Sequence, residues 1–142
     1  MTTIEKTVFL DTNVFIDQLQ QRAGMEAAEN IMTLGKERKI RICLSTLTVA
    51  NVSYIMRKTA GKKKMTKVFK DWLKYYVILP DNDMGIYSAV RNDCPDFEDG
   101  LQIASAEAEM CDAIITSNVR HFAPYTDIPV YTPEDFLAKL RR

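Results

Sequence analysis

The chain has 142 residues, of which 46% are apolar and 27% charged, a composition typical of one folded domain and unlike disordered or fibrous proteins. Its net charge is zero, but residues 1–76 carry 14 Lys or Arg against 7 Asp or Glu, whereas residues 77–142 carry 5 against 12. No apolar run approaches the roughly 18 residues of a membrane span and residues 1–6 do not resemble a secretory signal, so we expect a cytoplasmic protein without membrane segments.

The first elements along the chain alternate between strand and helix patterns. Residues 7–10 form a short apolar run, typical of a strand buried on both faces, which stops at Asp11. A helix is predicted for residues 14–19, a second for 25–39, and a strand for 40–44.

The next helix is predicted to start at Ser45 and Thr46, which are suitable N-cap residues. Helical spacing then predicts one apolar face, which consists of Leu47, Ala50, Asn51, Tyr54 and Ile55. Asn51 is therefore expected on the inward side of the helix.

The helix of residues 65–76 has the clearest periodicity in the chain. Its apolar stripe is formed by Met65, Val68, Phe69, Trp72, Leu73 and Tyr76. Lysines occupy the opposite face, within the segment 57–74 that holds eight basic residues and one acid. Such a face can attract phosphates, and it can equally be a solvated helix surface.

The rest of the chain continues the alternation. The predicted elements are a strand at 77–79, a helix at 83–91, a helix capped by Asp96 with Asp99 in a capping-box position, a strand at 113–115, an edge strand at 128–131, and a helix capped by Thr132. This order predicts an α/β domain with a parallel sheet and helices on both faces. Ligands bind such sheets beyond the carboxyl ends of the strands, where Asp11 and Asn118 lie.

Each polar residue at these positions also has a purely structural explanation. Asp11 can cap a helix, and the acids at 96, 98 and 99 can complement a helix dipole. Asn51 can be a buried amide bonded to backbone, and residues 116–118 can form a turn. Cys43, Cys94 and Cys111 have no CxxC spacing and His121 is the single histidine, which argues against zinc and for reduced, buried thiols.

Four motifs, taken together and in order, resemble the PIN-domain nucleases, which include the VapC-type toxins of toxin–antitoxin pairs. They are residues 8–14 (VFLDTNV), 44–51 (LSTLTVAN), 96–104 (DFEDGLQIA) and 114–122 (IITSNVRHF). The resemblance implies a single PIN-like domain over 1–142, with a three-layer α/β/α fold and a five-stranded parallel sheet ordered 3-2-1-4-5.

The resemblance also implies a catalytic site. The family's acidic cluster maps onto Asp11, Asn51, Asp99 and Asn118, so two of its members carry an amide instead of a carboxylate. Asp11 and Asp99 would bind one Mg²⁺ or Mn²⁺, and Asp96 would be an outer ligand or only a helix cap. Waters and phosphate oxygens would be positioned by Thr12, Asn13, Asn51, Thr116 and Asn118.

The implied activity is metal-dependent hydrolysis of RNA, with a toxin role, an antitoxin partner and a homodimer as further expectations. Lys63, Lys64 and Lys67 are candidate contacts to the RNA backbone. A second interpretation is a PIN-like module that binds RNA or protein without cutting, because the two asparagines weaken the site. A phosphatase of the haloacid-dehalogenase type fits less well, since Asn13 stands where its second Asp belongs.

Overall fold

The computed structural model describes residues 6–141. Its sheet has five parallel strands in the order β3-β2-β1-β4-β5, which confirms the predicted topology. The strands are β1 Lys6–Leu10, β2 Ile40–Ser45, β3 Val77–Leu79, β4 Ala113–Ile115 and β5 Val130–Tyr131. The predicted edge strand is thus an edge strand, shortened to two residues beside Pro129, whose carbonyl still accepts a bond from the amide of Ile114 at 2.9 Å.

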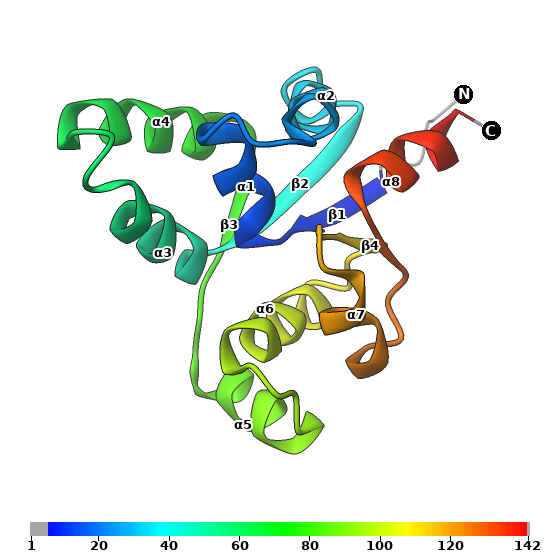
Figure 1. The fold of residues 1–142 in the computed structure, drawn as a ribbon. Helices are drawn as coiled ribbons and strands as arrows, with labels where there is room; N and C mark the ends of the chain where they lie inside the picture. The colour runs from blue at the N-terminus through cyan, green and yellow to red at the C-terminus, as the bar shows by residue number, and fades with distance from the viewer. Residues whose placement is uncertain (1–5, 142) are drawn as a thin grey trace.

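Helices cover both faces of this sheet (Figure 1). They are α1 Thr12–Leu19, α2 Met25–Lys36, α3 Thr46–Met56, α4 Lys62–Tyr75, α5 Asp83–Asn92, α6 Phe97–Ala108, α7 Val119–Phe122 and α8 Pro133–Leu140, with a short 3-10 helix, η1, at Ala123–Tyr125. Figure 1 shows α5, α6 and α7 on one side of the sheet and the other α-helices on the opposite side. The fold therefore has three layers, α/β/α, as the sequence predicts.

Successive side chains of the central strand, β1, point to opposite faces of the sheet, so the hydrophobic core has two parts. Val8 and Leu10 are buried against α1, α2 and their neighbours, whereas Phe9 points to the other face and packs with Ile103 of α6 and Phe122 of α7. Because β1 is paired on both sides, its carboxyl end is enclosed by β2 and β4. The amide of Asp11 extends this pairing by donating to the carbonyl of Ile115 at 3.0 Å.

The predicted helix caps are present. The Ser45 hydroxyl accepts from the amide of Leu47 at 3.0 Å, and a carboxylate oxygen of Asp96 accepts from the amide of Asp99 at 3.2 Å. Thr132 caps α8 in the same way. In each of these three helices, the N-cap residue correctly predicted where the helix begins.

The inward face of α3 was predicted wrongly. Its buried residues are Thr48, Val52 and Met56, whereas the side chains of Tyr54 and Ile55 are 65% and 40% exposed. Apolar residues surround this helix on most sides, so packing, and not periodicity, decides which of them are buried.

Three boundaries and positions differ from the sequence-based expectation. The second helix ends at Lys36 and not at 39, because Arg38 adopts a left-handed conformation with φ of 59°. The first helix begins at Thr12, directly after the strand. On α4 the predicted stripe holds for Met65 and Trp72, but Leu73 at its edge is 69% exposed.

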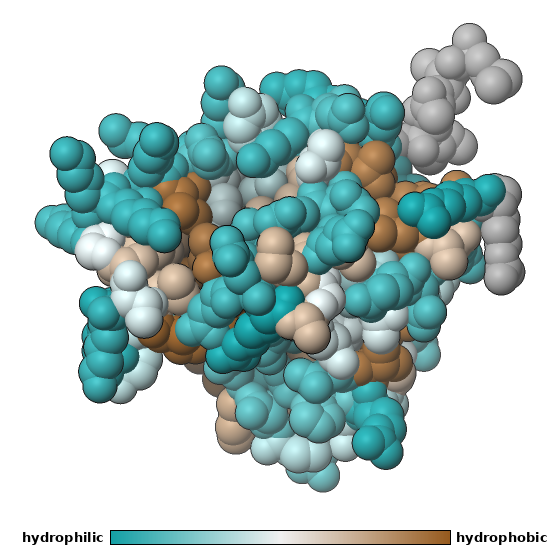
Figure 2. Space-filling model, turned by 45° about the horizontal axis from the view of Figure 1, so that its top comes forward, coloured by the Kyte–Doolittle hydropathy of each residue, from teal (hydrophilic) through white to brown (hydrophobic). Residues whose placement is uncertain are grey.

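The three cysteines are free and buried, as predicted. Across residues 6–141, no helix is both long enough and apolar enough to cross a membrane. Hydrophilic side chains cover most of the face shown in Figure 2, with small hydrophobic areas between them.

Candidate functional site

Asp11 lies at the carboxyl end of the central strand, with its side chain 1% exposed. Its Oδ1 accepts a hydrogen bond from Nε2 of Gln102 at 2.9 Å, and its Oδ2 accepts one from the hydroxyl of Thr116 at 2.8 Å. Burial raises the pKa of this carboxyl, while the bonds from Gln102 and Thr116 oppose the rise. The protein therefore holds a buried acid whose charge is favoured by two donors and disfavoured by the loss of water.

Gln102 of α6 belongs to this site and was not foreseen from the sequence. It is fully buried, and its Oε1 accepts from the amide of Thr12 at 3.0 Å while its Nε2 bonds to Asp11. The Thr12 hydroxyl lies 2.8 Å from that of Thr48 on α3, so α1, α3 and α6 meet at the strand end. The available signal was helical spacing, because Gln102 follows Asp99 by one turn on the same helix.

Three more acids stand at the start of α6: Asp96, Glu98 and Asp99. The pKa of Asp99 is raised to about 7, first by burial and then by the charges of Asp96, Asp11 and Glu98. The pKa of Glu98 is also raised, by burial and by Asp96 and Asp11. These four carboxyls, Asp11, Asp96, Glu98 and Asp99, thus form one acidic cluster, in which Glu98 was not foreseen as a site residue.

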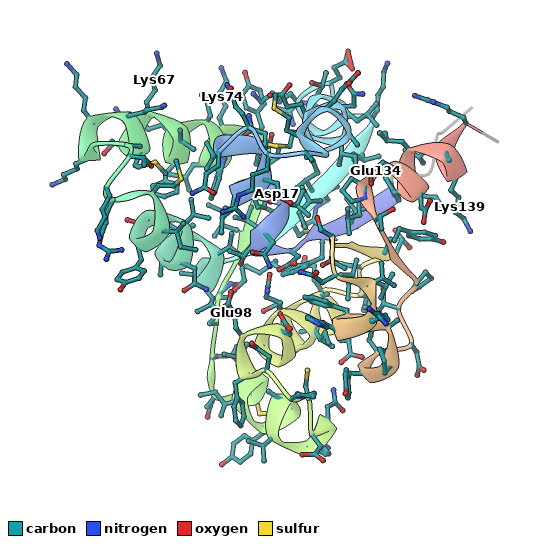
Figure 3. All side chains as sticks on the ribbon, viewed as in Figure 1. Asp17, Lys67, Lys74, Glu98, Glu134 and Lys139 are labelled. Carbon is teal, nitrogen blue, oxygen red and sulfur yellow. The ribbon has the colours of Figure 1, made fainter. Side chains whose placement is uncertain are left out.

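The two asparagines occupy different positions around this acidic cluster. Asn51 is half-buried on α3 beside Glu98, and its buried Nδ2 has no hydrogen-bond partner among the described residues. Figure 3 shows Glu98 at the end of α6 that faces α3. Asn118 has an exposed side chain, and its backbone amide donates to the Thr116 hydroxyl at 3.0 Å.

The remaining predicted residues are spread over a wider area. Asn13 is exposed next to the strand end, whereas Thr12 and Thr116 are buried and hydrogen-bonded within the protein. Lys63, Lys64 and Lys67 are exposed on α4. Figure 3 shows Lys67 and Lys74 on the outer side of this helix, pointing away from Glu98. The structure therefore gathers the acids but does not bring the lysines to them.

The donors of the acidic cluster are suited to a hard divalent cation. Carboxylates that raise one another's pKa gain from a positive charge between them, and oxygen ligands without His or Cys match Mg²⁺ or Mn²⁺. The hydrogen bonds from Gln102 and Thr116 do not use all the lone pairs of the Asp11 carboxylate. In the described part of the chain, no three Asp, Glu, His or Cys side chains are close enough together to enclose an ion. The cluster thus offers suitable ligands without forming a closed cage.

A family model described as "PIN domain" matches residues 7–120, which include every member of the acidic cluster. The chain belongs to the PIN-domain family. The match starts in β1 and ends in α7, so it covers four of the five strands of the sheet. No curated protein matches the chain in sequence.

Solved structures share the fold of this PIN domain at low sequence identity. FitAcB from Neisseria gonorrhoeae is 19% identical with a TM-score of 0.66, over 89% of this chain and 98% of the other. DNA-bound VapBC from Salmonella typhimurium is 15% identical with a TM-score of 0.69, over 90% and 98%. VapC20 from Mycobacterium tuberculosis is 10% identical with a TM-score of 0.65, over 86% and 98%.

Proposed function

We propose that this PIN domain is a divalent-metal-dependent endoribonuclease and the toxin of a toxin–antitoxin pair. The observation that carries the proposal is the acidic cluster at the carboxyl edge of the central strands, where α/β folds bind ligands. Family membership supports a nuclease. The structural neighbours support the finer assignment, because VapC20 is described as a toxin that cleaves the sarcin–ricin loop and a structure from Klebsiella pneumoniae as a toxin–antitoxin complex.

In this proposal, the residues of the acidic cluster and its neighbours have different roles. Asp11 is the principal carboxylate, and Gln102 and Thr116 fix the direction of its two oxygens. Asp99 is the second ligand, with Asp96 and Glu98 adding negative charge around it. When bound, Mg²⁺ or Mn²⁺ supplies charge neutralisation at the phosphate and a more acidic water.

The raised pKa of Asp99 sets a condition for this chemistry. With a pKa of about 7, a large fraction of Asp99 is protonated at neutral pH in the metal-free protein. Cation binding must then release a proton from Asp99, so affinity should fall as the pH falls below neutral. Asn51, Asn118, Thr12, Asn13 and Thr116 remain candidates for positioning waters and phosphate oxygens.

The direct test is cleavage of a mixed RNA pool by the purified protein in Mg²⁺, in Mn²⁺ and in EDTA. We expect cleavage that depends on the metal and disappears with EDTA and in the Asp11→Asn variant. Binding of the pool without cleavage in either metal would instead support the second candidate, an inactive RNA- or protein-binding module. Asn51 and Asn118 favour that candidate, because each carries an amide where the PIN-domain family usually has a carboxylate.

The partners follow from the same assignment. An antitoxin protein is proposed because one of the similar structures, from Klebsiella pneumoniae, is described as a toxin–antitoxin complex. RNA contact by Lys63, Lys64 and Lys67 is proposed from their exposure on α4 and the absence of ion pairs to them among the described residues. A homodimer is also proposed, and sedimentation at several concentrations would test it.

A further inference from the structure

A cavity of about 210 Å³ lies between the start of α6 and the segment formed by α7 and η1. We name it the α6–α7 pocket. One wall carries Asp96 and Asp99 of the acidic cluster, and the other carries Arg120 and His121 of α7 with Tyr125 of η1. Figure 1 shows α6 and α7 side by side on the same face of the sheet. The pocket is therefore directly adjacent to the acidic cluster and shares Asp96 and Asp99 with it.

The cationic wall of the pocket is not neutralised by the acids opposite. Arg120 is exposed and, within residues 6–141, forms no ion pair, although two carboxylates line the same cavity. A guanidinium presents a planar fork of N–H donors that fits the oxygens of a phosphate. Arg120 thus presents a guanidinium without an ion-pair partner in this part of the chain, across the pocket from Asp96 and Asp99.

An RNA strand at the acidic cluster needs such a group. Carboxylates repel a phosphodiester, and Lys67 and Lys74 of α4 point away from Glu98 (Figure 3). Arg120 and His121 are the basic side chains that line the pocket. The half-buried ring of Tyr125 adds a flat aromatic surface, on which a base can stack without regard to its identity.

We propose that the α6–α7 pocket is a nucleotide subsite, in which Arg120 binds the phosphate next to the one that is cleaved and Tyr125 stacks on its base. The subsite rests on the proposed ribonuclease function, since it holds the substrate against the acidic cluster. Its ligand is a single-stranded nucleotide segment with one phosphodiester and one unpaired base. Arg120 and Tyr125 are positioning residues, which act on binding and not on the reacting atoms.

Binding without cleavage gives the first test. Fluorescence anisotropy of a fluorescein-labelled, single-stranded RNA octamer is measured in EDTA for the parent and for Arg120→Ala, Tyr125→Leu and Tyr125→Phe. Loss of one charged phosphate contact or of one stacked base should weaken binding about tenfold. Tyr125→Phe keeps the ring and should bind like the parent. Arg141→Ala removes one exposed positive charge from the end of α8 and is the matched control.

Steady-state cleavage gives the second test. Arg120→Ala should raise KM about tenfold and leave kcat within about twofold, because a contact present in both ground and transition states affects binding alone. Arg120→Lys keeps the charge, loses the planar fork and should show a smaller rise in KM. It also serves as the folded comparison if the alanine variant melts at a lower temperature.

The outcomes separate the subsite from the function it serves. If Arg120→Ala and Tyr125→Leu bind RNA as tightly as Arg141→Ala does, the subsite is wrong. If the parent binds the octamer but cleaves no RNA in either metal, the proposed function is wrong and anisotropy still decides the subsite. A parent protein that does not bind the octamer overturns the subsite as well.

Discussion

The side-chain amide of Gln102 donates from Nε2 to Oδ1 of Asp11 at 2.9 Å. Its Oε1 accepts from the amide of Thr12 at 3.0 Å, so one side chain satisfies an acceptor and a donor at the end of the central strand. Both groups are buried, and an unpaired polar group there would be costly. Gln102 therefore fixes the carboxylate that the proposed mechanism uses most.

Gln102→Glu should make stability strongly dependent on pH. A carboxyl at this position faces Asp11, and two like charges out of water raise one another's pKa. At pH 4 the protonated Glu can still donate to Asp11, so the loss should be small. At pH 8 the charged pair should cost about 2 to 4 kcal/mol. Denaturant unfolding at both pH values measures this, and an equal loss at the two would contradict it.

Asp11→Asn should abolish metal-dependent cleavage and keep the fold. The new amide removes the charged ligand, and the Thr116 hydroxyl can turn to accept a hydrogen bond from it. Activity should fall by more than the about 100-fold that outer partners of a metal ligand contribute. Circular dichroism checks the fold, and a variant as active as the parent would exclude the mechanism.

Asp99→Asn should be equally inactive, whereas Asp96→Asn should retain more activity. Asn still accepts the hydrogen bond from the amide of Asp99 that caps α6, so Asp96→Asn loses only charge. The same cleavage assay ranks the two variants. A greater loss in Asp96→Asn would make Asp96 the principal ligand on α6.

The sequence predicted the start of a helix well where a single N-cap residue determines it. Ser45, Asp96 and Thr132 each begin a helix because a short polar side chain satisfies a free backbone amide. The strand order followed from a family resemblance and not from spacing. The helix α7 and the 3-10 helix after it have too few residues to show a period.

The site was predicted only in part, for physical reasons that differ between residues. Asp11 is marked by its place after an apolar strand, and Asp99 by the helix start. Gln102 follows Asp99 by one helical turn, but its hydrogen bond to Asp11 depends on how α6 packs against β1. Glu98 looks like any acid of a first helical turn, and its relation to Asp11 depends on distances that the sequence does not contain.

Asp99→Asn should also stabilise the metal-free protein at high pH. The folded-state pKa of about 7 lies above the ordinary value of 3.8, so charging Asp99 costs the folded state stability as the pH rises through this range. The variant should match the parent at pH 4 and exceed it by about 1 kcal/mol at pH 8, after discounting for partial exposure. Thermal melts in EDTA test this, with Asp127→Asn as an exposed control.

Asn51→Glu should make stability more responsive to metal. Without metal, a carboxyl beside Glu98 adds repulsion to the acidic cluster and should lower the melting temperature. With saturating Mn²⁺, the added ligand should give the variant a larger upward shift than the parent shows. Ala50→Glu adds the same charge at an exposed position of α3 and is the control. If Mn²⁺ raises the melting temperature of both variants equally, Asn51 does not face the metal.

Replacing Lys63, Lys64 and Lys67 with Ala should weaken RNA binding alike for all sequences. Each lost phosphate contact should flatten the dependence of log affinity on log salt by roughly 0.7 for single strands. Replacing Lys36, Lys39 and Lys139 removes the same charge elsewhere and should leave the slope unchanged. An unaltered slope in the first variant would make its three lysines a solvated surface.

The backbone around Asp11 and that around Asp99 differ in how readily they open. The Asp11 amide is bonded to Ile115 inside the paired centre of the sheet, so its hydrogen should exchange with solvent only when the whole domain unfolds. The Asp99 amide is held by the exposed Asp96 side chain at the end of a helix, where fraying is local. In the acidic cluster, the backbone of Asp11 is thus held firmly, whereas the first turn of α6 opens more easily. A bound substrate or partner can therefore move this turn while Asp11 stays in place.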